Sequence, residues 1–409
     1  MHSPNPFPGA SWVRTEFFAQ YFKNKGNTVA ISGSFSLKTL GKAGSRTLDG
    51  LKILNITPII MAPNLLSLVF NITSSFIFST VSLILLRPKI VIISVPNGET
   101  GLGSYIATRL LRIRKVVIDY RDEWEDHVIN RISPGIYKKS YLYLKRTMTK
   151  CYTKSNLVVA TTQPLAQKLI SRGIKDVKVI ANGADVNVFK PYDKQKSRAE
   201  IGIDKKDFVL VYSGGIGAYY RLDIVIKAMQ KASIKIHNLR LLMVGRGHTI
   251  QEILDLAKEI GLAGNVQYLG AKMNRDELAK IFSASDIGLI PYDSNPLWKN
   301  SIPVKALEYL ACGLPIIATV YEDSVLAKLI NENEVGLVAL PESVDSLAFA
   351  LEKIYEVYFS ASETKKNEVD KIDNSFEMEV SKRAILLIKT NFDRNELTRH
   401  FSALLENRF

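Results

Sequence analysis

A lysine and a glutamate three positions apart, Lys305 and Glu308, are the residues of this sequence best suited to binding chemistry. On a helix this spacing places both side chains on one face. An ammonium group near a helix N-terminus favours a phosphate, and a carboxylate one turn later can bind the two hydroxyls of a ribose. The pair therefore predicts a pocket for a nucleotide that carries a sugar.

The residues around this pair predict the elements that hold it. Pro303 suits the first turn of a helix, and Gly313 ends that helix before the apolar run 316–318. The segment thus predicts a loop, a short helix and a buried strand. An ordinary amphipathic helix with a Lys–Glu pair on its surface would have the same local pattern, so the neighbouring segments have to decide between the two.

Two further segments follow strand-like runs and could carry chemistry. Gly214, Gly215 and Gly217 come after an apolar run, where converging backbone amides can hold a phosphate. The acidic segment 119–126 follows another such run, and ligands bind at the carboxyl ends of strands in an open α/β sheet. A solvated acidic turn is the alternative for the second segment.

These motifs resemble those of a known family. The pattern Pro-x-Lys-x-x-Glu-Tyr at 303–309 is similar to the nucleotide-sugar motif of the retaining GT-B glycosyltransferases called "glycosyl transferases group 1". Many members have two glutamates separated by seven residues. Here the second is Glu308, and Asn300 stands at the position of the first. The run from Asn182 to Pro191 resembles the end of the family's first domain, and the resemblance extends from about Phe7 to Leu405.

The resemblance implies roles for particular residues. Catalysis would involve the cations Arg221 and Lys305, which neutralise the leaving diphosphate, and Asp122 on the acceptor side. Members usually have a cation at the position of Tyr220, so Arg221 is displaced by one residue. Gly9 would belong to a first loop that approaches the sugar or phosphate, with Ala10 in place of a second glycine. The donor would be bound by these residues: Gly9, Gly214, Gly215, Gly217, Arg221, Gly245, Tyr268, Leu269, Asn300, Ser301, Ile302, Lys305 and Glu308.

The order of elements predicts the fold class. Continuous apolar strands alternate with helices along the chain, which is typical of parallel sheets covered on both faces. We expect an α/β protein of GT-B type with two Rossmann-like domains facing across a cleft. Predicted strands cover 28–32, 90–95, 115–119, 157–161, 177–181, 208–212, 239–244, 266–269, 287–290 and 315–318.

The expected domains are an acceptor-binding domain at 1–190, a donor-binding domain at 191–375, and C-terminal helices at 376–409 that cross back to the first domain. Residues 363–373 read as a charged loop. No strand precedes the loop-like residues 1–10, although a Rossmann domain should open with one. We therefore expect the first domain to lack its first strand in this sequence, either because translation starts upstream of Met1, which we favour, or because the domain is one strand short.

Charge is distributed unevenly along the chain. Residues 1–190 hold 26 lysines and arginines against 10 carboxylates, while the remainder is nearly neutral. Because no nucleic-acid-binding module is visible, we expect an anionic membrane as the partner of the first half and a peripheral location at the cytoplasmic face. The helix expected at 65–86 could cross a bilayer by length, but its many serines favour a core helix with one membrane-facing edge.

The functional expectation is a retaining glycosyltransferase that moves a sugar from a nucleoside-diphosphate sugar to a lipid-linked glycan. We expect no metal site and no cofactor. Two alternatives remain open: a non-hydrolysing nucleotide-sugar epimerase on the same fold, and a non-catalytic protein that binds a nucleotide sugar. A glycosyltransferase needs an acceptor, whereas an epimerase converts the nucleotide sugar without one. A glycosyltransferase also releases a nucleoside diphosphate, whereas a protein that only binds the nucleotide sugar does not.

Overall fold

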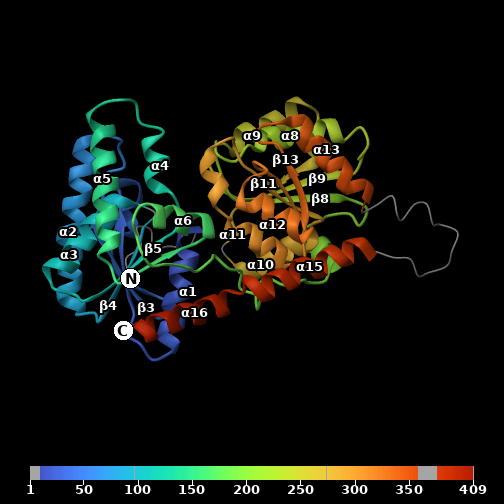
Figure 1. Ribbon diagram of the computed structural model, residues 1–409. Coiled ribbons are helices and arrows are strands. Elements are labelled where there is room, and N and C mark those ends of the chain that lie inside the picture. Colours follow the sequence, from blue (N-terminus) through green and yellow to red (C-terminus); the bar gives the residue numbers. More distant parts are fainter. Residues whose placement is uncertain (1–9, 96, 273, 358–374, 409) are drawn as a thin grey trace. The chain divides into compact units, whose positions relative to one another are not determined.

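The computed structural model describes residues 10–95, 97–272, 274–357 and 375–408. The chain forms two compact α/β units (Figure 1). Unit 1 consists of residues 1–181 and 396–409, and unit 2 of residues 182–395. The chain thus leaves unit 1 after Ala181 and returns to it at Glu396. The predicted charged loop at 363–373 and the loop-like residues 1–9, which include Gly9, lie outside the described residues.

Unit 2 is a doubly wound sheet of six parallel strands in the order β10-β9-β8-β11-β12-β13. Helices α8, α9 and α13 cover one face, and α10, α11, α12 and α15 cover the other (Figure 1). The strands are β8 (Phe208–Ile216), β9 (Leu239–Gly247), β10 (Val266–Tyr268), β11 (Ile287–Pro291), β12 (Ile316–Thr319) and β13 (Gly336–Ala339). The helices are α7 (Lys194–Glu200), α8 (Leu222–Ala232), α9 (Ile250–Glu259), α10 (Arg275–Ala284), α11 (Val304–Ala311), α12 (Val325–Asn333), α13 (Val344–Tyr355) and α15 (Ser375–Asn391), with 3-10 turns η2 (Ala263–Asn265) and η3 (Pro296–Asn300).

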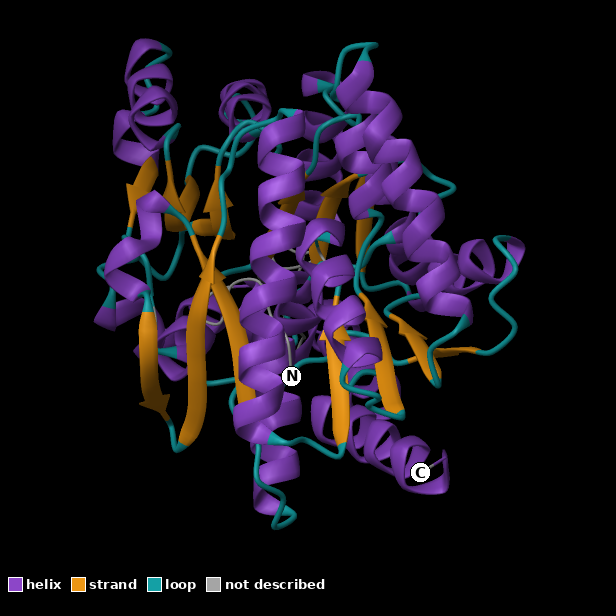
Figure 2. Ribbon diagram, turned by 90° about the vertical axis from the view of Figure 1, so that its left-hand side faces the viewer, coloured by secondary structure: helices purple, strands orange, loops and turns teal. Residues whose placement is uncertain are grey.

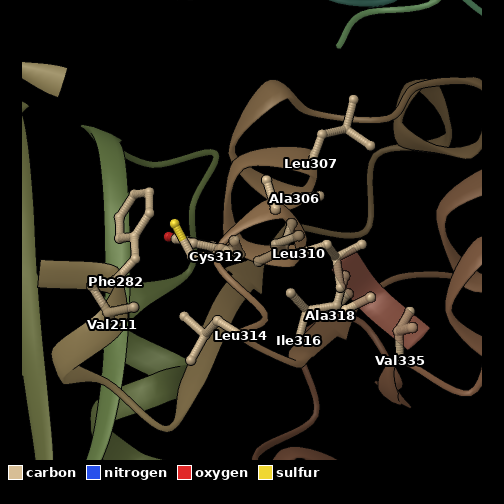
Figure 3. Packing of buried hydrophobic residues seen from close by; sticks show 14 of the residues in the cluster. Val211, Phe282, Ala306, Leu307, Leu310, Cys312, Leu314, Ile316, Ala318 and Val335 are labelled. Carbon is tan, nitrogen blue, oxygen red and sulfur yellow. The ribbon is translucent and has the colours of Figure 1, made fainter. Parts of the chain in front are cut away.

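The apolar runs of the sequence form the core because each strand is covered on both faces. In β8, Val209 and Val211 pack into the hydrophobic cluster on one side, while Phe208 and Leu210 pack into the cluster on the other. Figure 3 shows part of the first cluster, in which Val211 lies near the side chains at the end of α11. A strand buried on both faces reads as a continuous apolar run, which explains why these strands were predictable.

Unit 1 contains two groups of strands, which Figure 2 shows in orange. One sheet has the order β1-β3-β2, with β2 antiparallel to β3, and the other is parallel with the order β4-β5-β6-β7. The strands are β1 (Ala30–Phe35), β2 (Gly44–Leu48), β3 (Leu51–Pro58), β4 (Ile90–Ser94), β5 (Lys115–Tyr120), β6 (Leu157–Ala160) and β7 (Val177–Val179). The helices are α1 (Ala10–Asn24), α2 (Leu65–Leu86), α3 (Gly98–Leu110), α4 (Trp124–Ile129), α5 (Ile136–Thr153), α6 (Gln163–Ser171) and α16 (Arg394–Arg408), with the 3-10 turn η1 (Leu37–Lys42).

The C-terminal helix α16 packs on unit 1. The rings of Phe18 in α1 and Phe401 in α16 lie 4.7 Å apart between centroids, and both belong to a core cluster with residues of β4, β5 and β6. The prediction of two α/β units with parallel sheets is confirmed. The strands β2, β3 and β13 were not predicted. β3 lies at the start of the uncharged stretch 53–86, where its alternating pattern merges with the apolar residues that follow.

Helix α2 has an unusual distribution of side chains. Its serines and Asn71 are buried, and they bond to neighbouring elements: Ser75 Oγ donates to the Thr100 carbonyl, and Ser79 bonds to Ser104 of α3. Close packing needs Gly103 in α3, because a Cβ there would lie 2.5 Å from the Ile72 carbonyl oxygen. Leu68 is buried as well, but several other apolar residues point outward, with Leu66 at 76% and Leu85 at 71% exposed.

Length and composition would let α2 cross a membrane, although a third of its most apolar window is buried in the protein. The expectation of a core helix therefore holds only for its serine face. Its opposite face is apolar and exposed.

Candidate functional site

The glycine segment of unit 2 is part of a strand rather than a free loop. Strand β8 continues through Gly214 and Gly215 to Ile216, in parallel register with β9. Gly214 has φ +134° and Gly245 of β9 has φ +149°, and a Cβ on Gly245 would lie 1.7 Å from the Gly214 carbonyl oxygen. Only glycine tolerates this backbone conformation and this contact. The loop that connects β8 to α8 therefore begins at Gly217.

Lys305 reaches this glycine segment from the first turn of α11. Its Nζ would lie 2.8 Å from a Cβ at Gly214, and it lies 4.1 Å from the ring centroids of both Tyr212 and Tyr220. Within the described part of the chain, this buried ammonium group has no hydrogen-bond partner. Burial lowers the pKa of Lys305 to about 7, although the nearby Glu308 carboxylate opposes the shift. An ammonium held between two aromatic faces without a counter-ion can bind an anion.

A row of aromatic rings supports Lys305. Tyr212 packs against Tyr220, Tyr220 stacks on Tyr292 at 5.5 Å, and Tyr292 stacks on Trp298 at 4.2 Å with an interplanar angle of 5°. Tyr309 also ties α11 to β8, because its hydroxyl accepts a hydrogen bond of 2.8 Å from the Ser213 N–H. The helix that carries Lys305 is therefore fixed against the glycine segment.

Glu308 lies one turn after Lys305 and is 9% exposed. Its Oε1 lies 3.7 Å from the guanidinium of Arg394, which also donates to the Gly183 carbonyl oxygen at 2.8 Å. Burial raises the pKa of Glu308, while Arg394 and Arg275 lower it. Pro303 is the residue that caps α11, one position before its first turn, and Gly313 with φ +74° ends the helix.

Arg221 is already engaged by carboxylates. Its guanidinium contacts Asp223 at 2.7 Å and also pairs with Glu342. Arg221 can therefore neutralise a diphosphate only by giving up these partners. Lys305, in contrast, has no hydrogen-bond partner among the described residues and is available at the glycine segment.

The remaining donor-site candidates lie at strand ends or before α11. The Tyr268 hydroxyl donates to the Gly245 carbonyl oxygen at 2.8 Å, and Leu269 follows β10 beside β9. Asn300 ends the turn η3, and Ser301 and Ile302 connect it to α11. The Ser301 hydroxyl oxygen is buried and has no hydrogen-bond partner among the described residues. This hydroxyl could bind a ligand group.

Most of the acidic segment of unit 1 forms ion pairs. Asp119, at the end of β5, is buried and pairs with Arg14 at 2.9 Å. The carboxylates of Glu123, Glu125 and Asp126 pair with basic residues of α5, α6 and the turn after α6: Lys145, Lys168 and Arg172. Asp122 is exposed and accepts a hydrogen bond from the Trp124 N–H. It is the carboxylate of this segment best placed to meet a substrate.

Comparisons with known proteins agree with this geometry. Residues 193–369 match the family model named "Glycosyl transferases group 1". Unit 2 belongs to this family. The D-inositol 3-phosphate glycosyltransferase of Segniliparus rotundus is 32% identical over 172 residues, which are 40% of this chain and 37% of that protein. The enzyme of the same name from Rhodococcus opacus is 28% identical over 211 residues, or 49% of this chain and 46% of that protein. The chain thus spans less than half the length of these curated relatives.

Solved structures show the same fold over the whole chain. A glycosyltransferase from Rickettsia africae has a TM-score of 0.70 and 16% identity and covers 100% of this chain and 97% of its own. Anabaena Alr3699/HepE in complex with UDP and glucose has a TM-score of 0.71 and 16% identity, with coverage of 99% and 98%. At this identity the likeness shows the fold alone.

Several residues of this group 1 site were not found by sequence reasoning. Tyr212 and Tyr220 flank the glycine segment, and two tyrosines beside such a segment are a signal that could have drawn attention. Arg394 lies 86 positions from Glu308, so no local spacing connects them. The tertiary structure alone brings this arginine to the glutamate.

Proposed function

We propose that this chain is a retaining glycosyltransferase. It transfers a sugar from a nucleoside-diphosphate sugar to a membrane-associated, lipid-linked glycan, and it needs no divalent metal. The observation that carries the proposal is the buried ammonium of Lys305, which lies beside Gly214 and has no hydrogen-bond partner among the described residues. A diphosphate placed there would supply the missing negative charge.

The site suits departure of a diphosphate. The bond between the sugar's anomeric carbon and the diphosphate oxygen breaks, and negative charge grows on that oxygen. The Lys305 ammonium and backbone amides of the glycine segment would stabilise this charge in the transition state. The incoming hydroxyl forms the new glycosidic bond on the same face of the sugar and passes its proton to the leaving phosphate. This scheme needs no carboxylate nucleophile at Asn300.

The other half of the donor would lie against Glu308. A carboxylate that is 9% exposed and has an arginine neighbour remains able to accept hydrogen bonds from ribose hydroxyls. Tyr268 and Leu269 would form the wall for the nucleobase. The Anabaena protein was solved in complex with UDP and glucose, which supports a nucleoside diphosphate as the ligand of this fold.

Two features of unit 1 support a membrane-associated acceptor. The exposed face of α2 is apolar and includes Leu66 and Leu85. Helix α5 exposes Lys139, Tyr143 and Arg146 at helical spacing, with Lys150 one turn further on. Apolar groups beside cations suit a helix that lies on an anionic surface, with aromatic rings at the level of the headgroups. These features support our proposal of a peripheral protein at the cytoplasmic face of the membrane.

A donor panel tests the proposal directly. Thermal unfolding with UDP-, GDP- and ADP-sugars should show stabilisation by one class of base, because a ligand that binds the folded state raises its stability. Incubation of that donor with membrane extract should then release the nucleoside diphosphate. Conversion of the donor without any acceptor would identify an epimerase instead, and binding without release under all conditions would identify a non-catalytic protein.

A further inference from the structure

The first and last few residues of unit 2 pair with each other. The Ala184 N–H donates to the Phe392 carbonyl oxygen at 3.0 Å, and the Arg394 N–H donates to the Ala184 carbonyl oxygen at 3.0 Å. Glycine is needed at position 183, because a Cβ on Gly183 would lie 2.7 Å from the Phe392 carbonyl oxygen. The Asn-Gly run found in the sequence therefore joins the two ends of this unit.

The side chain of Arg394 connects this pairing to the donor site. It is buried, and its Nε donates to the Gly183 carbonyl oxygen at 2.8 Å. Its Nη2 lies 3.7 Å from Oε1 of Glu308, the carboxylate that would bind the ribose. A guanidinium has five N–H donors in one plane, so a single arginine can contact a carbonyl and a carboxylate at once.

Glu308 depends on this arginine for its charge. Burial raises the pKa of Glu308, and Arg394 is the strongest of the charges that oppose this rise, ahead of Arg275 and Lys305. An ionised carboxylate only accepts hydrogen bonds, and its two oxygens have about four acceptor positions, so a contact with Arg394 leaves positions for hydroxyl donors. Loss of the arginine would leave a buried carboxylate without its main partner, which is costly.

We propose that Arg394 is a positioning residue of the donor site, which holds the Glu308 carboxylate charged and in place and thereby sets the preference for ribose over deoxyribose. The inference rests on the proposed function, in which Glu308 accepts hydrogen bonds from ribose hydroxyls. Arg394 acts through Glu308 and does not itself contact the donor. The alternative is a structural arginine that only ties the two ends of unit 2 together through Gly183.

Substitutions separate these two roles. Arg394→Gln keeps an N–H donor for the Gly183 carbonyl oxygen but loses the charge, whereas Arg394→Lys keeps the charge. Arg198→Gln is the matched control, because Arg198 is also buried in unit 2, donates to a backbone carbonyl oxygen and pairs with Asp286 at 2.7 Å. Calorimetry measures the Kd of UDP-, GDP- and ADP-glucose and of the same donors without the 2′- or the 3′-hydroxyl of the ribose. The ratio of the deoxy Kd to the ribose Kd reports recognition of the ribose and cancels effects on the diphosphate.

The original chain and Arg198→Gln should bind the ribose form at least about tenfold more tightly than the weaker deoxy form. This ratio should fall to about two or less in Arg394→Gln and in Glu308→Gln, and Arg394→Lys should restore it to at least about five. A ratio that stays at about ten in Arg394→Gln, or that falls equally in Arg394→Lys and Arg198→Gln, would overturn the inference. Failure of all three donors to bind the original chain would instead refute the proposed function.

The link between the two side chains can also be measured without a donor. Arg394→Gln leaves Glu308 as a buried charge without its main partner, whereas the same substitution in the Glu308→Gln background does not. The unfolding midpoint should therefore fall by at least about 4 °C more in the original background, or only the double variant should fold. Equal losses in both backgrounds, or failure of both variants to fold, would show that Arg394 acts through Gly183 alone and would overturn the inference.

Discussion

Lys305 makes donor binding dependent on pH. Because burial lowers the pKa of Lys305 to about 7, roughly nine-tenths of the side chain is charged at pH 6 and roughly one-tenth at pH 8. A diphosphate binds the charged form and raises this pKa. The affinity for the donor is therefore highest well below pH 7, where Lys305 is charged, and it falls as the pH rises through 7. Between pH 6 and pH 8 the apparent Kd should increase about tenfold, or about 1.4 kcal/mol.

Isothermal titration calorimetry can detect the proton itself. At pH 8, binding should take up about 0.9 proton per donor, visible as a difference in heat between two buffers of different ionisation enthalpy. The ligand should be the intact nucleotide sugar, because each of its phosphates has one ester and one anhydride bond and therefore no second ionisation. The terminal phosphate of a free nucleoside diphosphate, in contrast, titrates near pH 6. Lys305→Arg, whose charge does not titrate, should bind with little dependence on pH in this range.

Three further variants test whether Lys305 is the group that takes up the proton. Lys305→Met should weaken donor binding, lower kcat and remove the proton uptake. At pH 6 this variant should also unfold at a higher temperature than the original protein, because its folded state no longer buries a charge. His248 lies near Gly217, so His248→Gln is a control for another side chain beside the glycine segment. Arg221→Gln should have the smaller effect on kcat, since its guanidinium already pairs with Asp223. Proton uptake that persists in Lys305→Met, or a Kd independent of pH in the original protein, would refute this account.

Three other predictions follow from the same structure. Glu308→Gln should weaken donor binding by about 1.5 to 3 kcal/mol in calorimetry, because a charged hydrogen-bond acceptor is lost, and an unchanged Kd would remove Glu308 from the ribose site. Asp122→Asn should lower kcat/KM for the acceptor by at least about tenfold with an unchanged unfolding midpoint and donor Kd; full activity would make Asp122 a simple cap of α4. A wash at 1 M salt should release the protein from membranes, since the screening length falls to about 3 Å. Replacing Lys139, Arg146 and Lys150 of α5 by Gln should reduce binding to anionic vesicles. The control variant, in which Lys205, Lys206 and Lys258 are replaced by Gln, should bind these vesicles like the original protein. Protein that resists salt and needs detergent would show that the apolar face of α2 inserts into the bilayer.

The sequence alone predicted the elements whose signals are local. Apolar runs such as 208–212 became buried strands, since a strand covered on both faces needs no polar positions. The spacing of Lys305 and Glu308, with Pro303 before them and Gly313 after them, predicted the short helix α11. Periodicity and capping act over a few residues, so they can be read without knowledge of the rest of the chain.

The tertiary structure decided which of these residues are available for chemistry. The sequence shows Lys305 and Arg221 as two cations near one glycine segment. Packing places Lys305 between aromatic rings, with no hydrogen-bond partner among the described residues, and gives Arg221 two carboxylates. Serines of α2 face inward for a similar reason, since Ser75 and Ser79 find hydrogen-bond partners on α3 while apolar residues such as Leu66 and Leu85 stay exposed. Such outcomes depend on partners far away in the sequence, and the burial and pairing of a charge exist only once those partners are in place.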